Sequence, residues 1–346
     1  MATDLAALGE VALIRRLTEG FPLAEDVVQG VGDDCAVLDV DGPEVVLLSA
    51  DSLVEGVHFD ARLSPMPHIG FKAISAAVSD IYAMNGRPTV ATVSCSVSSR
   101  YTVEHLDELY QGIRAACDYY GLSLVGGDTT GSLRDLFLSV TVLGTALRES
   151  VVYRTGAQSG DVLCLSADVG AAYAGLLLLQ REQHVLVANP DAEVQLDGYP
   201  HALGRQLRPV PSREVVSAWA AAGVQPTALI DVSDGLASEL HHLARASQVG
   251  FRVVQAELPI HDETHAIAQL MNLPVSTLAL YGGEDYVLLY TLAQPDFNRF
   301  QDSPFCHPIG FVTDTAGAVR LFQPDGSEAD IAAGWFDHFN TKPTNR

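Results

Sequence analysis

The stretch LLSADSLVEGVHFD, residues 47–60, joins an apolar run to a group of acids. Residues 45–50 are mostly aliphatic, which is typical of a buried strand. Asp51 follows at once, and a glutamate, a histidine and another aspartate come soon after it. Carboxylates are costly to bury unless they are paired or bind a metal. The stretch therefore predicts a core strand that carries acidic groups to a functional site.

On both sides of this stretch, patterns typical of helices are mixed with patterns typical of strands. Residues 67–86 begin with proline, carry small residues along one side and end in glycine, which favours a helix packed closely on a sheet. The polar segment 148–161 separates two such patterns, so we expect two mixed α/β domains, 1–150 and 151–346. Expected strands span 45–50, 89–97, 122–125, 136–147, 162–166 and 228–232, and expected helices span 67–86, 106–117, 171–180, 212–222 and 236–246.

Acidic residues recur at the ends of several apolar runs, often beside glycine. For any single one, a turn or a helix cap is the more common explanation. Asp80 differs, because it lies among alanines within an expected packed helix, where an unpaired carboxylate is seldom buried. Ligands of open α/β sheets gather where strands end. A shared site at such strand ends would bring together these residues: Asp33, Asp34, Asp51, Asp80, Asp128, Asp231, Asp234, Glu284 and Asp285.

A converging group of acids predicts bound cations. Two carboxylates about 4 Å apart repel by roughly 4 kcal/mol at an effective dielectric constant of 20, so a cluster must bind cations or take up protons. Ligand sets made only of oxygen favour magnesium or manganese, and magnesium keeps positions for water and substrate phosphates. The sequence therefore predicts metal ions, several Mg²⁺ in the simplest case, that carry a polyphosphate.

Composition limits the alternatives. The 346 residues include 20 basic and 43 acidic ones, and the net charge of −23 argues against binding to nucleic acid or to an anionic membrane. Only Lys72 and Lys342 are lysines, so a GxxxxGK[ST] phosphate loop is excluded. The five cysteines form no CxxC pair, and the longest apolar run, near residues 169–179, is too short to span a bilayer. We expect a cytoplasmic protein with buried thiols.

Six motifs follow one another over nearly the whole chain: GDDCAVL, SADSLVEGVHF, KAISAAVSDIYAMNGRP, VGGDTTGS, DVSDGL and GGEDYVLL. Together they resemble the thiamine-monophosphate kinases, within the superfamily of aminoimidazole-ribotide synthetase-like ATP enzymes. The resemblance implies a two-domain α+β fold and a homodimer joined through its N-terminal domains. It also implies transfer of the γ-phosphoryl group of ATP to thiamine monophosphate, with Mg²⁺ as cofactor.

The same resemblance assigns roles to residues. The implied metal ligands are Asp34, Ser49, Asp51, Asp80, Asp128, Asp231 and Asp234, of which Asp51, Asp80, Asp128 and Asp234 are also expected to be catalytic. The implied nucleotide contacts are Tyr110, Gly126, Gly127, Arg154 and Ser233, and the implied acceptor contacts are His58, Glu284 and Trp335. Core packing remains an open interpretation of Tyr110 and Trp335, and an ordinary satisfied polar role remains one of His58. Relatives commonly carry a hydroxyl residue where this chain has Ala50.

Several other functions fit the sequence less well. Selenophosphate synthetase requires an early reactive cysteine, and no cysteine precedes Cys35. The hydrogenase-maturation dehydratase has a C-terminal cysteine tail, whereas this sequence ends in HFNTKPTNR. Aminoimidazole-ribotide synthetase is the hardest rival to exclude from residues alone. A non-catalytic cation-binding or scaffold protein is disfavoured because the acids do not follow the twelve-residue spacing of a calcium loop.

Overall fold

The computed structural model describes residues 5–211 and 213–333. Its strands are β1 (Val27–Gln29), β2 (Ala36–Asp39), β3 (Glu44–Val54), β4 (Arg87–Ser98), β5 (Ser123–Ser132), β6 (Phe137–Leu147), β7 (Val162–Leu165), β8 (Ala228–Asp231), β9 (Gly250–Val254), β10 (Leu288–Leu292), β11 (His307–Thr313), β12 (Val319–Phe322) and β13 (Glu328–Asp330). Its helices are α1 (Leu5–Leu8), α2 (Glu10–Thr18), α3 (Met66–Ala83), α4 (Val103–Tyr120), α5 (Ala171–Ala188), α6 (Pro200–Leu207), α7 (Arg213–Ala222), α8 (Leu236–Ser247), α9 (Asp262–Leu270), α10 (Val275–Tyr281) and α11 (Gln294–Phe300), with 3₁₀ turns at Arg148–Ser150 and Gln255–Glu257.

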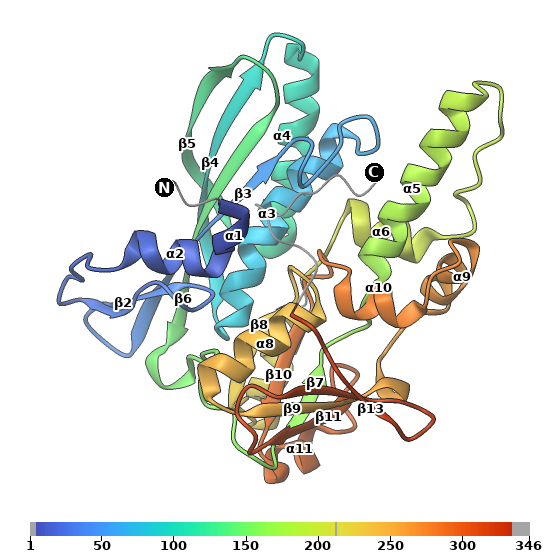
Figure 1. Cartoon of the computed structure of the whole chain (residues 1–346). Coiled ribbons are helices and arrows are strands. Elements are labelled where there is room, and N and C mark those ends of the chain that lie inside the picture. The colour runs from blue at the N-terminus through green and yellow to red at the C-terminus, as the bar shows by residue number, and fades with distance from the viewer. Residues whose placement is uncertain (1–4, 212, 334–346) are drawn as a thin grey trace.

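The strands form two mixed sheets. The first has the order β1-β2-β3-β6-β4-β5, and the second has the order β13-β12-β9-β11-β7-β10-β8. Neighbouring strands are antiparallel except for β4 with β5 and β9 with β12. The parallel pair of the first sheet is joined by α4, since parallel strands need a long crossover. Figure 1 shows the two sheets in separate parts of the molecule, with α3 and α4 beside the first and α8 beside the second.

Helix α3 packs against the first sheet and also contacts β8 of the second. Fifteen of its eighteen residues are buried, as its alanine-rich sequence predicts. Two glycines let α3 and α4 approach closely. A Cβ atom on Gly70 would lie 2.0 Å from the carbonyl oxygen of Leu109, and one on Gly112 would lie 1.9 Å from that of Pro67. The register of α3 against α4 is therefore fixed by backbone contact.

The mixed α/β class is confirmed, and so are the expected helix at 67–86 and the buried, free cysteines. Two expected strand ends are wrong. β3 continues through Asp51 to Val54, and β5 continues through Asp128 to Ser132. Both aspartates stay in the backbone ladder, opposite Val140 and Ser94, because the ladder uses main-chain groups and tolerates a polar side chain on its open face. These acids therefore lie within strands and not beyond their ends.

The described helices include none with the combination of length and hydropathy that crossing a membrane requires. The largest hydrophobic cluster extends from the first sheet to one face of the second, where it includes Leu229 and Tyr290, and the next largest lies on the other face of the second sheet. One contains Leu47, Ile74 and Val140 from β3, α3 and β6, and the other contains Ile230, Leu240 and Leu289 from β8, α8 and β10. The C-terminal end of α3 and the end of β8 meet where the two sheets approach each other.

Candidate active site

Three carboxylates from distant parts of the chain meet beside α3. Asp34 lies just before β2, Asp80 near the C-terminal end of α3, and Asp231 at the end of β8. One carboxylate oxygen of each residue lies within 4.8 Å of the others. We call these three residues the acid triad. Oxygen donors at this spacing suit a hard divalent cation such as Mg²⁺.

The environment of Asp34 fits a metal ligand. Its side chain is only 1% exposed, and Oδ1 accepts a hydrogen bond from Arg154 Nη2 at 2.6 Å. Its Oδ2 is buried and has no hydrogen-bond partner among residues 5–211 and 213–333. A buried carboxylate oxygen without a partner is costly. An ion bound by the triad would remove that cost.

Burial and mutual repulsion raise the pKa values in the triad. Burial, followed by the charges of Asp231, Asp34 and Asp51, raises the pKa of Asp80 well above its ordinary value. Burial and then the charge of Asp34 raise the pKa of Asp231 to about 7, and the same two causes raise the pKa of Asp33 to about 6. Burial also raises the pKa of Asp34. A cation that binds here therefore competes with protons.

Two buried serines hold the triad in place. Ser49 Oγ on β3 donates a hydrogen bond to Asp80, and Ser79 Oγ on α3 donates one to Asp231 at 2.6 Å. Asp51 lies two residues after Ser49, so both side chains project from the same face of β3. The charge of Asp51 acts on both Asp80 and Asp231. The structure thus brings Asp51 and Ser49 close to the triad.

The loop after β8 carries Ser233 and Asp234. The Asp234 amide donates to Glu239 Oε1 at 3.1 Å, and the Ser233 carbonyl accepts from the amide of Glu284 at 2.6 Å. Glu239 is buried at the start of α8, and burial followed by the charges of Asp234 and Asp231 raises its pKa well above its ordinary value. The hydrogen bond from the Asp234 amide to the buried Glu239 therefore holds this loop against the start of α8.

A cavity of about 380 Å³ opens beside β5, and four of the residues assigned to nucleotide or metal line it. Tyr110 forms one wall from α4 and is 36% exposed, so it is not a simple core residue. Gly127 has φ 155°, and a Cβ atom there would lie 1.9 Å from the Val93 carbonyl oxygen, so only glycine fits. The lining residues are Val93, Tyr110, Leu124, Gly126, Gly127, Asp128 and Thr129.

His58 lies in a turn that is tied back to β3. Its Nδ1 accepts a hydrogen bond from the backbone amide four residues earlier at 2.9 Å, so a neutral ring carries its proton on Nε2.

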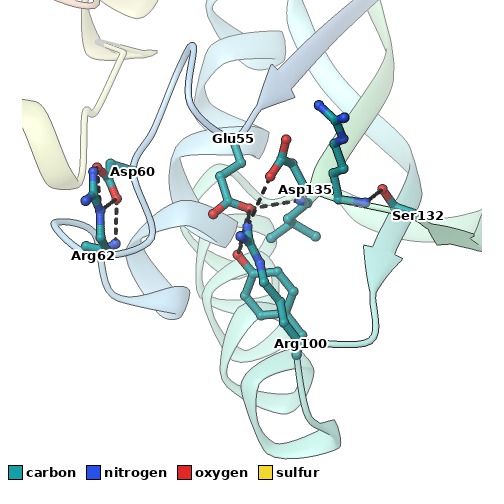
Figure 2. Close-up of polar contacts among 9 residues, drawn as sticks. Glu55, Asp60, Arg62, Arg100, Ser132 and Asp135 are labelled. Atoms are coloured by element: carbon teal, nitrogen blue, oxygen red, sulfur yellow. Dashed lines mark hydrogen bonds and ion pairs between the residues drawn. The ribbon is translucent and has the colours of Figure 1, made fainter. Parts of the chain in front are cut away.

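Glu55 anchors the same turn through polar contacts that Figure 2 shows. Its Oε2 accepts hydrogen bonds from Tyr101 Oη at 2.7 Å and the Leu136 amide at 2.9 Å, and it forms an ion pair with Arg100.

Glu284 is held between two helices. Lys72 Nζ on α3 lies 2.5 Å from its Oε1, and Gln206 Nε2 on α6 donates to its Oε2 at 3.3 Å. Lys72 Nζ also donates to the carbonyl oxygen of His58 at 3.4 Å. The two residues assigned to the acceptor side, His58 and Glu284, are thus linked through one ammonium group.

The residues assigned to metal do not all gather in one place. Asp34, Ser49, Asp51, Asp80 and Asp231 gather around the triad, while Asp128 lies in the cavity beside β5 and is not one of the three acids within 4.8 Å. Trp335 lies outside the described residues. Sequence reasoning missed Ser79, Glu239 and the contacts of Lys72. The position of Ser79 directly before Asp80, and a lysine inside an apolar helix, were available signals.

Comparisons with known proteins show the family to which the chain is similar. The family described as "AIR synthase related protein, N-terminal domain" matches residues 32–146. The chain is similar to the thiamine-monophosphate kinase of Bacillus subtilis (strain 168), with 31% identity over 96% of this chain and 100% of that protein. It is 33% identical to the thiamine-monophosphate kinase of Escherichia coli (strain K12), over 97% and 99% of the two chains.

Solved structures give the same result. The structure described as "AaThiL complexed with AMPPCP and TMP" superposes with a TM-score of 0.81 at 30% identity, and the match covers 98% of this chain and 99% of that one. Hydrogenase maturation protein HypE in complex with ATP superposes with a TM-score of 0.66 at 21% identity, over 95% and 97% of the chains. The second likeness shows a shared fold.

Proposed function

Because the chain belongs to the thiamine-monophosphate kinase family, we propose that it transfers the γ-phosphoryl group of ATP by direct in-line displacement to the phosphate of thiamine monophosphate, giving thiamine diphosphate. Full-length relatives at 31% and 33% identity support the activity. The acid triad is the structural observation that carries the proposal, because three partly or fully buried carboxylates within 4.8 Å of one another need a cation to stay ionised together.

The acceptor chemistry agrees with such a site. A phosphate monoester has its second pKa near 6, so it is mostly a dianion at neutral pH and needs no general base. The difficulty is that two anions must meet in line. A site of this kind requires cations and fixed positions more than it requires a proton acceptor.

Asp34, Asp80 and Asp231 would hold Mg²⁺, and Ser49, Asp51, Asp128 and Asp234 would serve further ions of a group of several. Bound Mg²⁺ neutralises phosphate charge and orients the reacting oxygens. The protein itself contributes rigid ligands, because Ser49 and Ser79 hold two of the carboxylates by hydrogen bonds. Glu239 holds the Asp234 loop in the same way.

The nucleotide would lie along β5. The cavity lined by Tyr110, Gly126 and Gly127 supports this assignment, since glycine allows a ligand to approach the backbone. Arg154 would contact phosphate, where its planar fork suits oxyanions, and Ser233 would lie on the same side. Arg154 Nε is buried and has no hydrogen-bond partner within the described part of the chain, which is consistent with a role toward an anion.

Thiamine monophosphate would bind near His58 and Glu284, with Trp335 as a third contact. The link between His58 and Glu284 through Lys72 supports one shared acceptor side. The aromatic face of an indole would suit a thiazolium or pyrimidine ring.

We also propose that the chain divides into domains at 1–150 and 151–346 and forms a homodimer through its first sheet. β5 is an edge strand of that sheet, and nine of its ten residues are exposed, including Leu124 and Val125. An open, partly apolar edge strand is a natural site for pairing with a second copy. The buried, free cysteines support a cytoplasmic location.

A coupled assay with ATP, Mg²⁺ and thiamine monophosphate tests the proposal, and formation of thiamine diphosphate is the expected result. Turnover on a formylglycinamidine ribotide with no thiamine diphosphate formed would instead favour an aminoimidazole-ribotide synthetase. Melting curves separate catalysis from a passive scaffold. A stabilisation that requires Mg²⁺ and ATP together indicates a joint metal and nucleotide site.

A further inference from the structure

Lys72 is a buried cation in an otherwise apolar helix. Its side chain is 5% exposed, and it is one of two lysines in the chain. A buried ammonium group is costly unless its donors are satisfied. Here they reach Glu284 Oε1 at 2.5 Å and the His58 carbonyl at 3.4 Å, which lie 226 residues apart in sequence. The contacts of Lys72 therefore join the turn after β3 to the loop before β10.

The loop that carries Glu284 is held at several points besides Lys72. Glu284 has φ 67°, a left-handed conformation that is uncommon outside glycine, and its amide donates to the Ser233 carbonyl at 2.6 Å. The buried carboxylate of Asp285 accepts hydrogen bonds from the amides of Gly170 and Ala172, at 2.6 and 3.2 Å. With the backbone fixed in this way, the direction of the Glu284 side chain depends on its own two partners, Lys72 and Gln206.

From this arrangement we propose that Lys72 is a positioning residue for the phosphate acceptor: it holds the Glu284 carboxylate and the His58 turn in the one relative arrangement that binds thiamine monophosphate. The inference rests on the proposed function, because it takes His58 and Glu284 as the acceptor side. Lys72 acts through these residues and needs no contact with the reacting phosphates. Its effect therefore falls on the binding of the acceptor.

The test is steady-state kinetics of Lys72→Met, which keeps the length of the side chain and removes the charge. The Michaelis constant for thiamine monophosphate is expected to rise by about 10-fold to 100-fold, the range seen when a supporting residue behind a ligand contact is lost. The Michaelis constant for ATP is expected to stay within about twofold, since independent sites do not couple. Unchanged acceptor binding, or equal effects on both substrates, would overturn the proposal.

A double-variant cycle shows whether Lys72 acts through Glu284. In a Glu284→Gln background, Lys72→Met is expected to raise the acceptor Michaelis constant by less than it does in the wild type, because the Glu284 contact is already lost and only the contact with the His58 carbonyl remains. A full additional effect in that background would refute the positioning role. If Lys72→Met does not fold, Lys72→Gln keeps a polar group of similar length, and the same rise in the acceptor Michaelis constant decides the question.

A control residue lies in the same loop between β3 and α3. Arg62 forms an ion pair with Asp60 at 2.5 Å, which Figure 2 shows. The Arg62 side chain is 76% exposed, in contrast to the 5% of Lys72. Arg62→Ala is expected to leave both Michaelis constants unchanged. If the proposed function is wrong, the wild-type chain itself will form no thiamine diphosphate. Failure of the present inference would appear as an active wild type whose Lys72 variants bind the acceptor normally.

Discussion

The two ends of α3 treat buried charge in opposite ways. Near its C-terminal end, the carboxylate of Asp80 lies close to those of Asp34 and Asp231, so that groups of like charge are neighbours. In its N-terminal half, Lys72 meets Glu284, so that opposite charges neutralise each other. The two residues are eight positions apart, about 12 Å at a rise of 1.5 Å per residue. The first arrangement requires a cation or bound protons from solution, whereas the second is complete within the protein.

The largest effect is expected from the like-charged end. Asp80→Asn should reduce kcat by about 10³-fold, because it removes a central ligand for the ion that stabilises charge in the transition state. The fold should survive, since a neutral side chain relieves repulsion in the triad. Kinetics and a melting curve of the same sample measure both. Asp107→Asn, at an exposed position of α4, is the matched control. Retained turnover in Asp80→Asn would remove the distinction between the two ends.

A second prediction concerns pH and metal together. The pKa of Asp231 is raised from 3.8 to about 7, so the folded chain binds a proton that the unfolded chain has released. Without Mg²⁺, the free energy of unfolding should therefore decrease as pH rises from about 4 through about 7, by an amount on the order of a few kcal/mol. Added Mg²⁺ should reverse the trend, because it binds the ionised carboxylates.

Melting temperatures across this pH range, with Mg²⁺ and with a chelator, measure the effect. Asp231→Asn should flatten the dependence, while Asp107→Asn should not. The ion pair between Lys72 and Glu284 provides the comparison. Because its two charges neutralise each other, we do not expect Mg²⁺ to reverse any effect of that pair on stability. If Mg²⁺ does not change the melting temperature of the wild type at any pH, the result would contradict a metal site at the triad.

A smaller effect is expected at the anchor of the His58 turn. Tyr101→Phe removes the hydroxyl that donates to Glu55 at 2.7 Å, and the loss should lower the free energy of unfolding by about 1 kcal/mol. Chemical denaturation measures it. Because the Leu136 amide and Arg100 still bind Glu55, the turn should keep its shape and kcat should change little. A loss of turnover as large as that of Asp80→Asn would mean that the turn takes part in the chemistry.

The sequence predicted much of the local structure and the identity of the acids. The helix containing Asp80 followed from its alanine-rich pattern and flanking proline and glycine, because these features act locally. The ends of β3 and β5 did not follow, since Asp51 and Asp128 looked like terminators but remain paired in the ladder. Pairing between strands distant in sequence decides such ends, and a single sequence does not reveal it.

The candidate site was predicted in its residue types but not in its contacts. The motifs predicted Asp34, Asp80 and Asp231 as metal ligands, and the structure brings these three carboxylates together. No pattern near Lys72 or Glu284 indicated that they would pair, because they are 212 positions apart. The same is true of Ser79, whose hydroxyl reaches Asp231 across 152 positions. Long-range partners of this kind require the folded chain.

The glycine contacts between α3 and α4 limit how this protein can be redesigned. Gly70 lies two residues before Lys72, and its close approach to Leu109 leaves no room for the helix to slide or rotate. Helix α3 therefore behaves as one rigid unit, and it sets the distance between Lys72, on the proposed acceptor side, and the acid triad. An engineer who wants a larger or smaller acceptor should leave α3 and the loop at residues 282–287 unchanged, because that loop is hydrogen-bonded to the segment that carries Asp231 and Asp234. Helix α6 is the better place to vary, since it contacts Glu284 through Gln206 and carries none of the acids.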